Sequence, residues 1–171
     1  MEISIQMAST NAEIDQVRGL CRQWLDLHWQ NFPTDWPTSG KGMEPDHFNA
    51  VLENLSELHS RPRGAIFLAL LGDQSVGCVM YGEASPGVAE FNRMFVNEAG
   101  RGRGIGRLLL DRMIDQMIQD GYGKVVFSSA NFLKHAKAMY QAAGFVDVPH
   151  PERFPSEWKP YIYFLERSLT E

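Results

Sequence analysis

The chain has 171 residues, of which 44% are hydrophobic and 22% charged, and its formal net charge is −5 at pH 7. This composition is typical of a globular protein and excludes a disordered or collagen-like chain. The acidic balance argues against general nucleic-acid binding, which depends on lysine and arginine side chains that neutralise phosphates. The length fits one domain over residues 1–171.

Residues 1–6 lack the basic start and apolar core of a secretory signal. The longest apolar run, residues 65–71, is far shorter than the roughly 20 residues that span a bilayer. We therefore expect a cytoplasmic protein without membrane contact. Cys21 and Cys78 are far apart in the sequence and lie among apolar neighbours, which predicts two buried thiols and no disulfide framework. The five histidines lack the spacing of a metal site, so no metal is expected.

The first hundred residues predict a strand, two helices and a meander of three strands. Residues 4–7 alternate weakly, and Asn11 is a plausible cap for a helix that carries apolar residues on one stripe. A proline-rich loop over residues 31–43 precedes a second helix, which follows Pro45 and continues to Leu58. Strands are then expected at residues 64–71, 74–83 and 88–96, with the turn Gly72-Asp73 joining the first two as an antiparallel hairpin.

The remaining residues predict alternating helices and strands. The helices cover residues 106–119 and 133–143, and the strands cover residues 124–130, 145–148 and 161–165. The connection from residue 96 through a helix to residue 124 requires a parallel pair of strands. The fold class is therefore α/β, with one mixed, mostly antiparallel sheet and helices on both faces, and a ligand is expected at the edge where that parallel pair ends.

The turn between the third meander strand and the next helix is rich in glycine and arginine, and reads Gly-Arg-Gly-Arg-Gly-Ile-Gly-Arg over residues 100–107. Backbone N–H groups at a helix start, together with the helix dipole, favour an anion at such a turn. The glycine spacing does not match Gly-x-Gly-x-x-Gly, and no Gly-Lys precedes a Ser or Thr, so the dinucleotide and nucleoside-triphosphate interpretations both fail.

The remaining pattern, Arg101-x-x-Gly104-x-Gly106, resembles the pyrophosphate-binding motif of the GNAT superfamily of acetyl-coenzyme A (acetyl-CoA)-dependent N-acetyltransferases. Residues 89–96 resemble the fourth strand of that family, in the Glu-x-x-Arg form of one bacterial subgroup. Downstream, the resemblance continues through Asn131, Tyr140 and the Gly-Phe pair at 144–145, and residues 161–169 are similar to the closing strand. It is weak over the first sixty residues, which usually set the substrate.

This resemblance implies an acyl-CoA N-acyltransferase fold whose two parallel strands splay apart to hold acetyl-CoA as co-substrate. It implies that the backbone of Met94, Phe95 and Val96 pairs with the pantetheine arm and that Asn131 bonds its amides; a helix cap is the other interpretation of Asn131. The pyrophosphate would be held by the turn residues Arg101, Gly102, Arg103, Gly104, Ile105, Gly106 and Arg107.

For catalysis, the resemblance implies that Tyr140 protonates the departing CoA sulfur and that Glu90 accepts the amine proton directly or through water. A core aromatic and a solvent-facing carboxylate are the respective alternatives, and Glu83 is a rival base. The acceptor, a small-molecule or protein amine, would attack the thioester directly in a ternary complex. Aromatic residues at two ends of the chain could wall its pocket: Phe32, Trp36, Phe154, Trp158 and Tyr161.

Two rival functions are open at this point. A non-catalytic module that binds or senses acyl-CoA would carry the same phosphate-binding turn. An arginine-rich turn that docks nucleic acid is disfavoured by the acidic balance, so no nucleic-acid partner is expected. The oligomeric state, including a homodimer, stays open.

Overall fold

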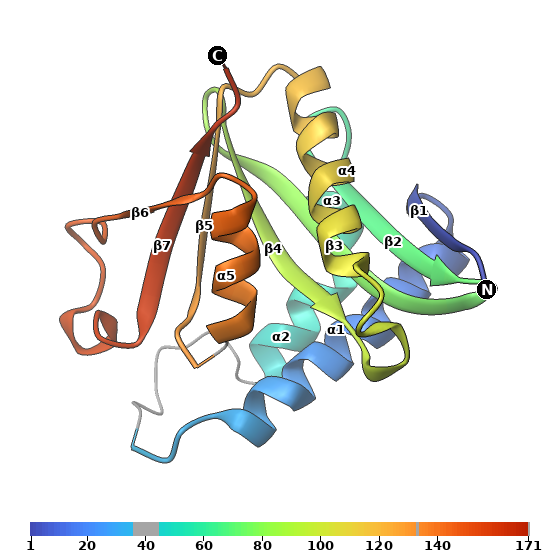
Figure 1. Cartoon of the computed structure of the whole chain (residues 1–171), viewed down its shortest axis with the longest axis horizontal. Helices are drawn as coiled ribbons and strands as arrows, with labels where there is room; N and C mark the ends of the chain where they lie inside the picture. The colour runs from blue at the N-terminus through green and yellow to red at the C-terminus, as the bar shows by residue number, and fades with distance from the viewer. Residues whose placement is uncertain (36–44, 133, 171) are drawn as a thin grey trace.

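The computed structural model describes residues 1–35, 45–132 and 134–170, and its strands form one seven-stranded sheet in the order β1-β2-β3-β4-β5-β7-β6 (Figure 1). Only β4 and β5 pair in parallel, so the prediction of a mixed, mostly antiparallel sheet is confirmed. The strands are β1 (Ile3–Met7), β2 (Ala65–Leu71), β3 (Gln74–Ser85), β4 (Val88–Val96), β5 (Lys124–Ala130), β6 (Val146–Val148) and β7 (Ile162–Ser168).

Helices cover both faces of this sheet. One face carries α1 (Asn11–Asn31), α2 (Pro45–Glu53) and α3 (Leu55–Leu58), and the other carries α4 (Ile105–Gln119) and α5 (Lys134–Ala142), as Figure 1 shows. Two short 3₁₀ turns, η1 (Glu98–Gly100) and η2 (Ser156–Trp158), connect elements. Each face buries its own apolar cluster, the larger beneath α4 and α5 and the smaller beneath α1 to α3. No helix in the described ranges is long and apolar enough to cross a membrane.

The start of α1 corrects one prediction, because Thr10 and not Asn11 is the N-cap. The Thr10 hydroxyl accepts a hydrogen bond from the backbone N–H of Glu13 at 3.2 Å, and the Glu13 carboxylate accepts one from the Thr10 N–H at 2.9 Å. This reciprocal pair is a capping box, which satisfies two backbone donors at once. Thr10 and Asn11 are both residue types that cap helices well. Glu13, three residues after Thr10, favours Thr10 as the N-cap because it completes the capping box.

The single helix predicted to continue from Pro45 to Leu58 is also corrected, because it divides at Asn54 into α2 and α3. The Asn54 side-chain amide donates to the Ala50 carbonyl at 2.8 Å. Asparagine competes in this way with the backbone for helix carbonyls, which weakens a helix at its position. The apolar stripe still continues through the break, since Leu52 and Leu55 are both buried.

The two cysteines are buried free thiols, as predicted, and they lie close together in the fold. Cys21 of α1 and Cys78 of β3 lie in the same smaller apolar cluster, and each thiol shifts the pKa of the other. Cys78 also donates its S–H to the backbone carbonyl of Arg93, with 3.5 Å between sulfur and oxygen. The sequence separation of the two cysteines hides their proximity, which arises because α1 packs across β3.

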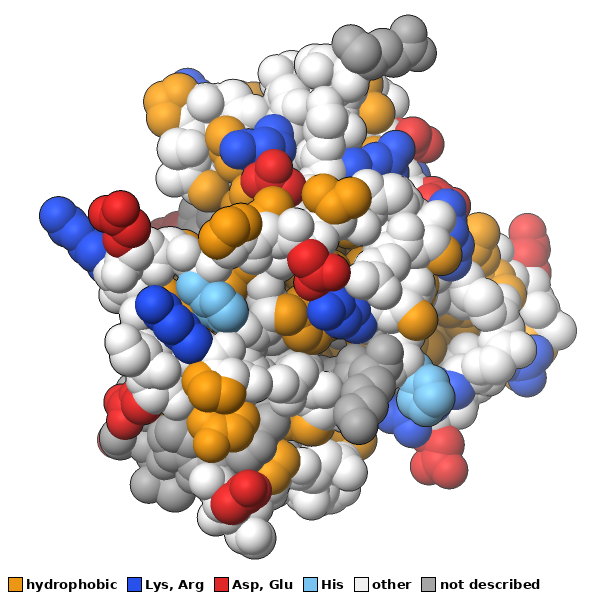
Figure 2. Space-filling view, turned by 60° about the vertical axis from the view of Figure 1, so that its left-hand side comes forward, with side chains coloured by type: hydrophobic (Ala, Val, Ile, Leu, Met, Phe, Trp, Pro, Cys, Tyr) orange, Lys and Arg blue, Asp and Glu red, His pale blue; other side chains and the backbone are white. Residues whose placement is uncertain are grey.

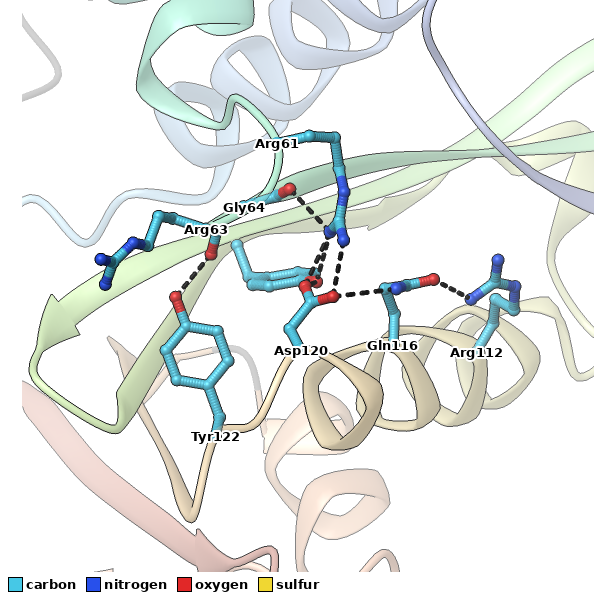
Figure 3. A network of polar contacts seen from close by, with 8 residues as sticks. Arg61, Arg63, Gly64, Arg112, Gln116, Asp120 and Tyr122 are labelled. Atoms are coloured by element: carbon cyan, nitrogen blue, oxygen red, sulfur yellow. Dashed lines mark hydrogen bonds and ion pairs between the residues drawn. The ribbon is translucent and has the colours of Figure 1, made fainter.

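A polar network fixes the C-terminal end of α4 to the segment before β2 (Figure 3). The Arg61 guanidinium donates to both carboxylate oxygens of Asp120, at 2.7 and 2.6 Å, and Gln116 donates to the same carboxylate at 3.0 Å. The buried Tyr81 hydroxyl donates to it as well. These hydrogen bonds fix the position of the C-terminal end of α4 on the sheet. The N-terminal end of α4, at Ile105, lies beside the site described next.

Candidate active site

The parallel pair β4 and β5 separates after only three rungs. The last paired residues are Glu90 and Val126, although β4 continues to Val96 and β5 to Ala130. In Figure 1 the two strands lie together at the top of the view and diverge toward the bottom, with α5 in front of them. Directly after the last rung, the rings of Phe91 and Phe127 stack with centroids 4.0 Å apart. The divergence frees backbone groups of both strands for a ligand.

A β-bulge bends β4 where this divergence begins. Met80 pairs with Asn92 and Cys78 pairs with Phe95, so β4 holds one extra residue between the two rungs. Arg93 occupies the bulge with φ of +54°, a left-handed conformation that residues other than glycine rarely adopt. Bulges redirect side chains and are frequent beside binding sites.

The space between the diverging strands is a cavity of about 200 Å³, called here the wedge cavity. Tyr140 and Ala136 of α5 and Trp24 of α1 close it. The two strands contribute the remaining lining residues: Asn92, Arg93, Met94, Phe127, Ser128 and Ser129. The lining thus combines aromatic rings with residues that carry hydroxyl, amide and guanidinium groups.

A second cavity, of about 480 Å³, adjoins the first and shares Trp24, Met94 and Ala136 with it. It follows the end of β4 toward the glycine-rich turn and will be called the arm cavity. Its lining brings together four of the predicted cofactor-binding residues: Met94, Phe95, Val96 and Arg101. His28 of α1 also lines the arm cavity. Burial lowers the pKa of this imidazole, which favours its neutral form.

The glycine-rich turn ends in an uncapped helix. Gly104 is the N-cap of α4 and has φ of +75°, no side chain caps the first turn, and that turn holds no acidic residue. The first intrahelical bond runs from the Leu108 N–H to the Gly104 carbonyl, so the N–H groups of Ile105, Gly106 and Arg107 have no helical acceptor. A Cβ on Gly102 or Gly104 would meet no atom within 4 Å, so the turn is open to an anion.

The turn's other residues have different roles. A Cβ on Gly106 would lie 3.2 Å from the Met139 sulfur, so this glycine allows α4 and α5 to pack closely. Arg101 donates from Nε to the Val96 carbonyl at 3.3 Å, and Arg107 forms an exposed ion pair with Asp111 at 2.9 Å. Arg103 is exposed.

Tyr140 is almost fully buried, with 2% of its surface exposed, and lies among the rings of Phe91, Phe127 and Phe145. Burial raises the pKa of its phenol well above the ordinary value, and the neighbouring Tyr163 raises it further. The hydroxyl is therefore protonated at neutral pH and is available as a donor at the wedge cavity.

Three other predicted residues lie outside the lining of both cavities. Glu90 is an exposed residue on the last rung of the parallel pair, and partial desolvation by its surroundings raises the pKa of its carboxyl group. Glu83, the rival base, is exposed and forms an ion pair with Arg63 at 2.6 Å. The Asn131 side-chain N–H₂ donates to the Pro160 carbonyl at 2.7 Å, which leaves its amide oxygen for a ligand; α5 begins three residues later.

The predicted aromatic wall is divided by the fold. The rings of Phe32 and Trp158 lie 6.3 Å apart, and Tyr161 contacts Trp158 edge-on at the same centroid distance. Phe154 packs instead against His150 and Phe164. Trp36 lies outside the described residues. Within those residues no cluster of three or more potential metal ligands occurs.

Several residues that line the wedge cavity have no functional signal in the sequence. Trp24 belongs to the apolar stripe of its helix, and Ser128 and Ser129 belong to a β-branched strand. Arg93 stood in the Glu-x-x-Arg pattern without a role. The Glu-x-x-Arg pattern was the one sequence indication that Arg93 has a role. The bulge itself could not be foreseen, because Arg93 and not a glycine adopts its left-handed conformation.

A splayed parallel pair beside a glycine-led, uncapped helix defines an α/β protein of the GNAT acetyltransferase fold class. The chain belongs to the Acetyltransferase (GNAT) family, which matches residues 21–145. It is also similar to an uncharacterized N-acetyltransferase of Dictyostelium discoideum, with 30% identity over 76 residues. That match covers 44% of this chain and 31% of the Dictyostelium protein.

Solved structures agree with the fold. An acetyltransferase of the GNAT family from Staphylococcus aureus superposes with a TM-score of 0.77 at 19% identity, covering 99% of this chain and 100% of that one. The PaiA N-acetyltransferase of Thermoplasma acidophilum, solved in complex with coenzyme A, gives a TM-score of 0.70 at 14% identity and covers 98% and 99% of the two chains. The predicted family and fold class are therefore confirmed.

Proposed function

We propose that this protein transfers the acetyl group of acetyl-CoA to a primary amine, by direct attack of the amine within a ternary complex. The observation that carries the proposal is the continuity between two cavities: the arm cavity extends from the region of Arg101 to Met94, where the wedge cavity begins. A long cofactor with a diphosphate at one end and a thioester at the other matches that layout.

The residues present fit such a cofactor at both ends. The open N–H groups at the start of α4 suit a diphosphate, and Arg101 adds a positive charge at the same end of the arm cavity. The freed backbone of residues 94–96 can pair with amides of the pantetheine arm as an added strand does. The chemistry that acetyl-CoA supplies is an acetyl carbonyl activated by a thioester.

The side chains around the wedge cavity supply proton handling. As the amine nitrogen bonds to the acetyl carbon and the carbon–sulfur bond breaks, the Tyr140 hydroxyl donates to the departing sulfur. Glu90 accepts the amine proton through water, because it lies at the last rung of the β4–β5 pair and does not line the wedge cavity. The raised pKa of its carboxyl group makes the carboxylate a stronger base than one with the ordinary pKa.

The test combines binding with turnover. Acetyl-CoA at about 100 times its Kd should raise the free energy of unfolding by roughly 2.7 kcal/mol, and a panel of amines should release free CoA thiol only when an acceptor is present. Binding without thiol release from any amine would support a non-catalytic acyl-CoA sensor instead. Absence of binding at millimolar cofactor would exclude both functions.

A surface consideration argues against the nucleic-acid alternative. Figure 2 shows one face of the molecule, on which acidic and basic side chains are interspersed and no continuous basic stripe is seen. Nucleic-acid binding depends on such a stripe.

A further inference from the structure

The wedge cavity contains a cation without a matching anion. Arg93 is partly buried and lines the cavity, and within the described ranges no Asp or Glu approaches it to ion-pair distance. The described lining of the cavity contains no carboxylate either. Arginine is rarely removed from water unless it is paired with a negative charge, so this arrangement favours the binding of a negatively charged group of a ligand beside Arg93.

The two side chains that contact the Arg93 guanidinium carry no negative charge. Its Nε contacts the Met80 sulfur at 3.3 Å, and its Nη2 lies 3.0 Å from Nε2 of His59. Nδ1 of His59 lies 3.0 Å from the Tyr81 carbonyl, which can only accept, so the imidazole carries its proton on Nδ1 and accepts from Arg93 through Nε2. His59 orients the guanidinium without neutralising its charge.

The imidazole also stays neutral at physiological pH. His59 is 6% exposed, and burial lowers its pKa to about 4, while the charge of Arg93 acts in the same direction. Arg93 is thus the one charged residue in the described lining of the cavity, and His59 does not add a second charge beside it. The β-bulge sets the direction in which the Arg93 side chain leaves the strand, and the contacts with Met80 and His59 hold its guanidinium.

We infer that Arg93 binds a carboxylate of the acceptor, and that the acceptor is a small molecule that carries both an amine and a carboxylate, such as an amino acid. The inference rests on the proposed acetyl transfer. A guanidinium recognises a carboxylate through paired N–H donors. Since Arg93 and Tyr140 line the same cavity, a molecule anchored by its carboxylate presents its amine on the side where the thioester reacts.

This assignment opposes the expectation from net charge. An acidic protein attracts cationic acceptors such as polyamines over long distances. Inside the wedge cavity, however, the local charge is that of Arg93, and a polyamine would meet it without a carboxylate to compensate. The cavity of about 200 Å³ also suits a small acceptor.

The experiment compares matched acceptors by CoA-thiol release. Each amino acid in a panel is tested beside its amide and its decarboxylated amine, with the native protein and with Arg93→Gln, Arg93→Lys and Arg22→Gln. The native protein should prefer the carboxylate-bearing member of a pair. Arg93→Gln should lower kcat/KM for that member by roughly 10- to 150-fold, the worth of one lost charge-assisted hydrogen bond, and change that of the amide little.

The other variants separate charge from structure. Arg93→Lys retains the charge and should keep the order of preference at a reduced margin, which also covers the case in which Arg93→Gln fails to fold. Arg22 is an exposed arginine of α1 that lines neither cavity, so Arg22→Gln should leave the preference unchanged.

A binding measurement keeps the inference testable when no amine is acetylated. N-acetyl amino acids and their amides are titrated into the CoA-saturated protein and followed by thermal shift. A preference for the carboxylate form that disappears in Arg93→Gln supports the inference without turnover. Equal response to both forms across the panel, or a preference that survives in Arg93→Gln, overturns it, whereas CoA binding and thiol release remain the separate test of the proposed function.

Discussion

The rings of Phe91 and Phe127 stack in parallel, 4.0 Å between centroids, immediately after the last rung that joins β4 to β5. Both rings are buried, with 1% and 7% of their surfaces exposed. The stack replaces backbone pairing by side-chain contact where the strands begin to diverge. The apex of the wedge cavity is therefore held by two aromatic residues from strands that separate beyond them.

We expect this stack to be energetically coupled. Phe91→Leu and Phe127→Leu keep most of the apolar volume but remove the ring pair, and a double-mutant cycle should give a coupling energy of about 0.5–1.5 kcal/mol. Urea unfolding of the four proteins measures it. Independent, additive losses would show that the rings merely fill space.

Gly104→Ala should abolish stabilisation by acetyl-CoA. Gly104 adopts φ of +75° at the start of α4, and a Cβ there would point into the open space assigned to the diphosphate. Gly87→Ala is a matched control, because Gly87 has φ of +79°, equally open surroundings and a place in the β3–β4 hairpin. Both variants should lose about 1–2 kcal/mol from left-handed strain.

Only the Gly104 variant should also lose the cofactor-dependent rise in Tm. Thermal unfolding with and without acetyl-CoA distinguishes the two effects. An equal cofactor response in both variants would remove the start of α4 from the binding site.

Local patterns predicted the β2–β3–β4 meander, the parallel connection from β4 through α4 to β5 and the glycine-rich turn before α4, because hydrophobic periodicity and glycine spacing act over a few residues. The full strand order, with β7 between β5 and β6, was not predicted. The capping box at Thr10 was equally local, and Glu13 was the available indication. The lining of the wedge cavity was not predictable in this way. It joins Trp24, Arg93 and Ser129, which come from three distant segments. It also depends on a bulge at Arg93, and an arginine gives no sequence indication of a left-handed conformation.

Tyr140→Phe should slow turnover by roughly 100-fold while it leaves acetyl-CoA binding intact. Because burial raises the phenol pKa, the hydroxyl stays protonated above pH 10, and the native enzyme should show no loss of kcat from this group up to that pH. Tyr122→Phe is the control, since Tyr122 is 6% exposed and donates to the Arg63 carbonyl beside the polar network of Figure 3. A Tyr140 variant as fast as the Tyr122 variant would exclude the donor role.

His59 should make the fold sensitive to mild acid. Its folded-state pKa, about 4, lies below the ordinary value of about 6.5, so the unfolded chain binds a proton more readily in that interval. Stability is therefore full above about pH 6.5 and declines as pH falls toward 4, by roughly 3 kcal/mol from this group. Urea titrations at pH 7, 5.5 and 4.5 should show a smaller decline in His59→Gln, whereas the exposed His47→Gln should follow the native curve.

Asp120→Asn should destabilise the protein at neutral pH more than in acid. Burial pushes the pKa of the Asp120 carboxyl group upward, but donors from Arg61, Tyr81 and Gln116 outweigh it, so the folded-state pKa is lower than the ordinary value. The contribution of the carboxylate is thus complete above about pH 4 and is lost as pH falls through the folded-state pKa. Its side chain is only 6% exposed, and replacing its charge-assisted hydrogen bonds should cost about 1.5–3 kcal/mol at pH 7.

The matched variant for this test is Asp111→Asn on the same helix. Asp111 forms an ion pair with Arg107 at 2.9 Å, but its side chain is 52% exposed, so the loss should be no more than about 0.5 kcal/mol. Urea unfolding at pH 7 and pH 3 compares both variants with the native chain. The difference between Asp120→Asn and the native protein should shrink at pH 3, because the unfolded native chain is then protonated at Asp120 while the folded carboxylate resists protonation. A difference that is constant with pH would assign the effect to packing and not to charge.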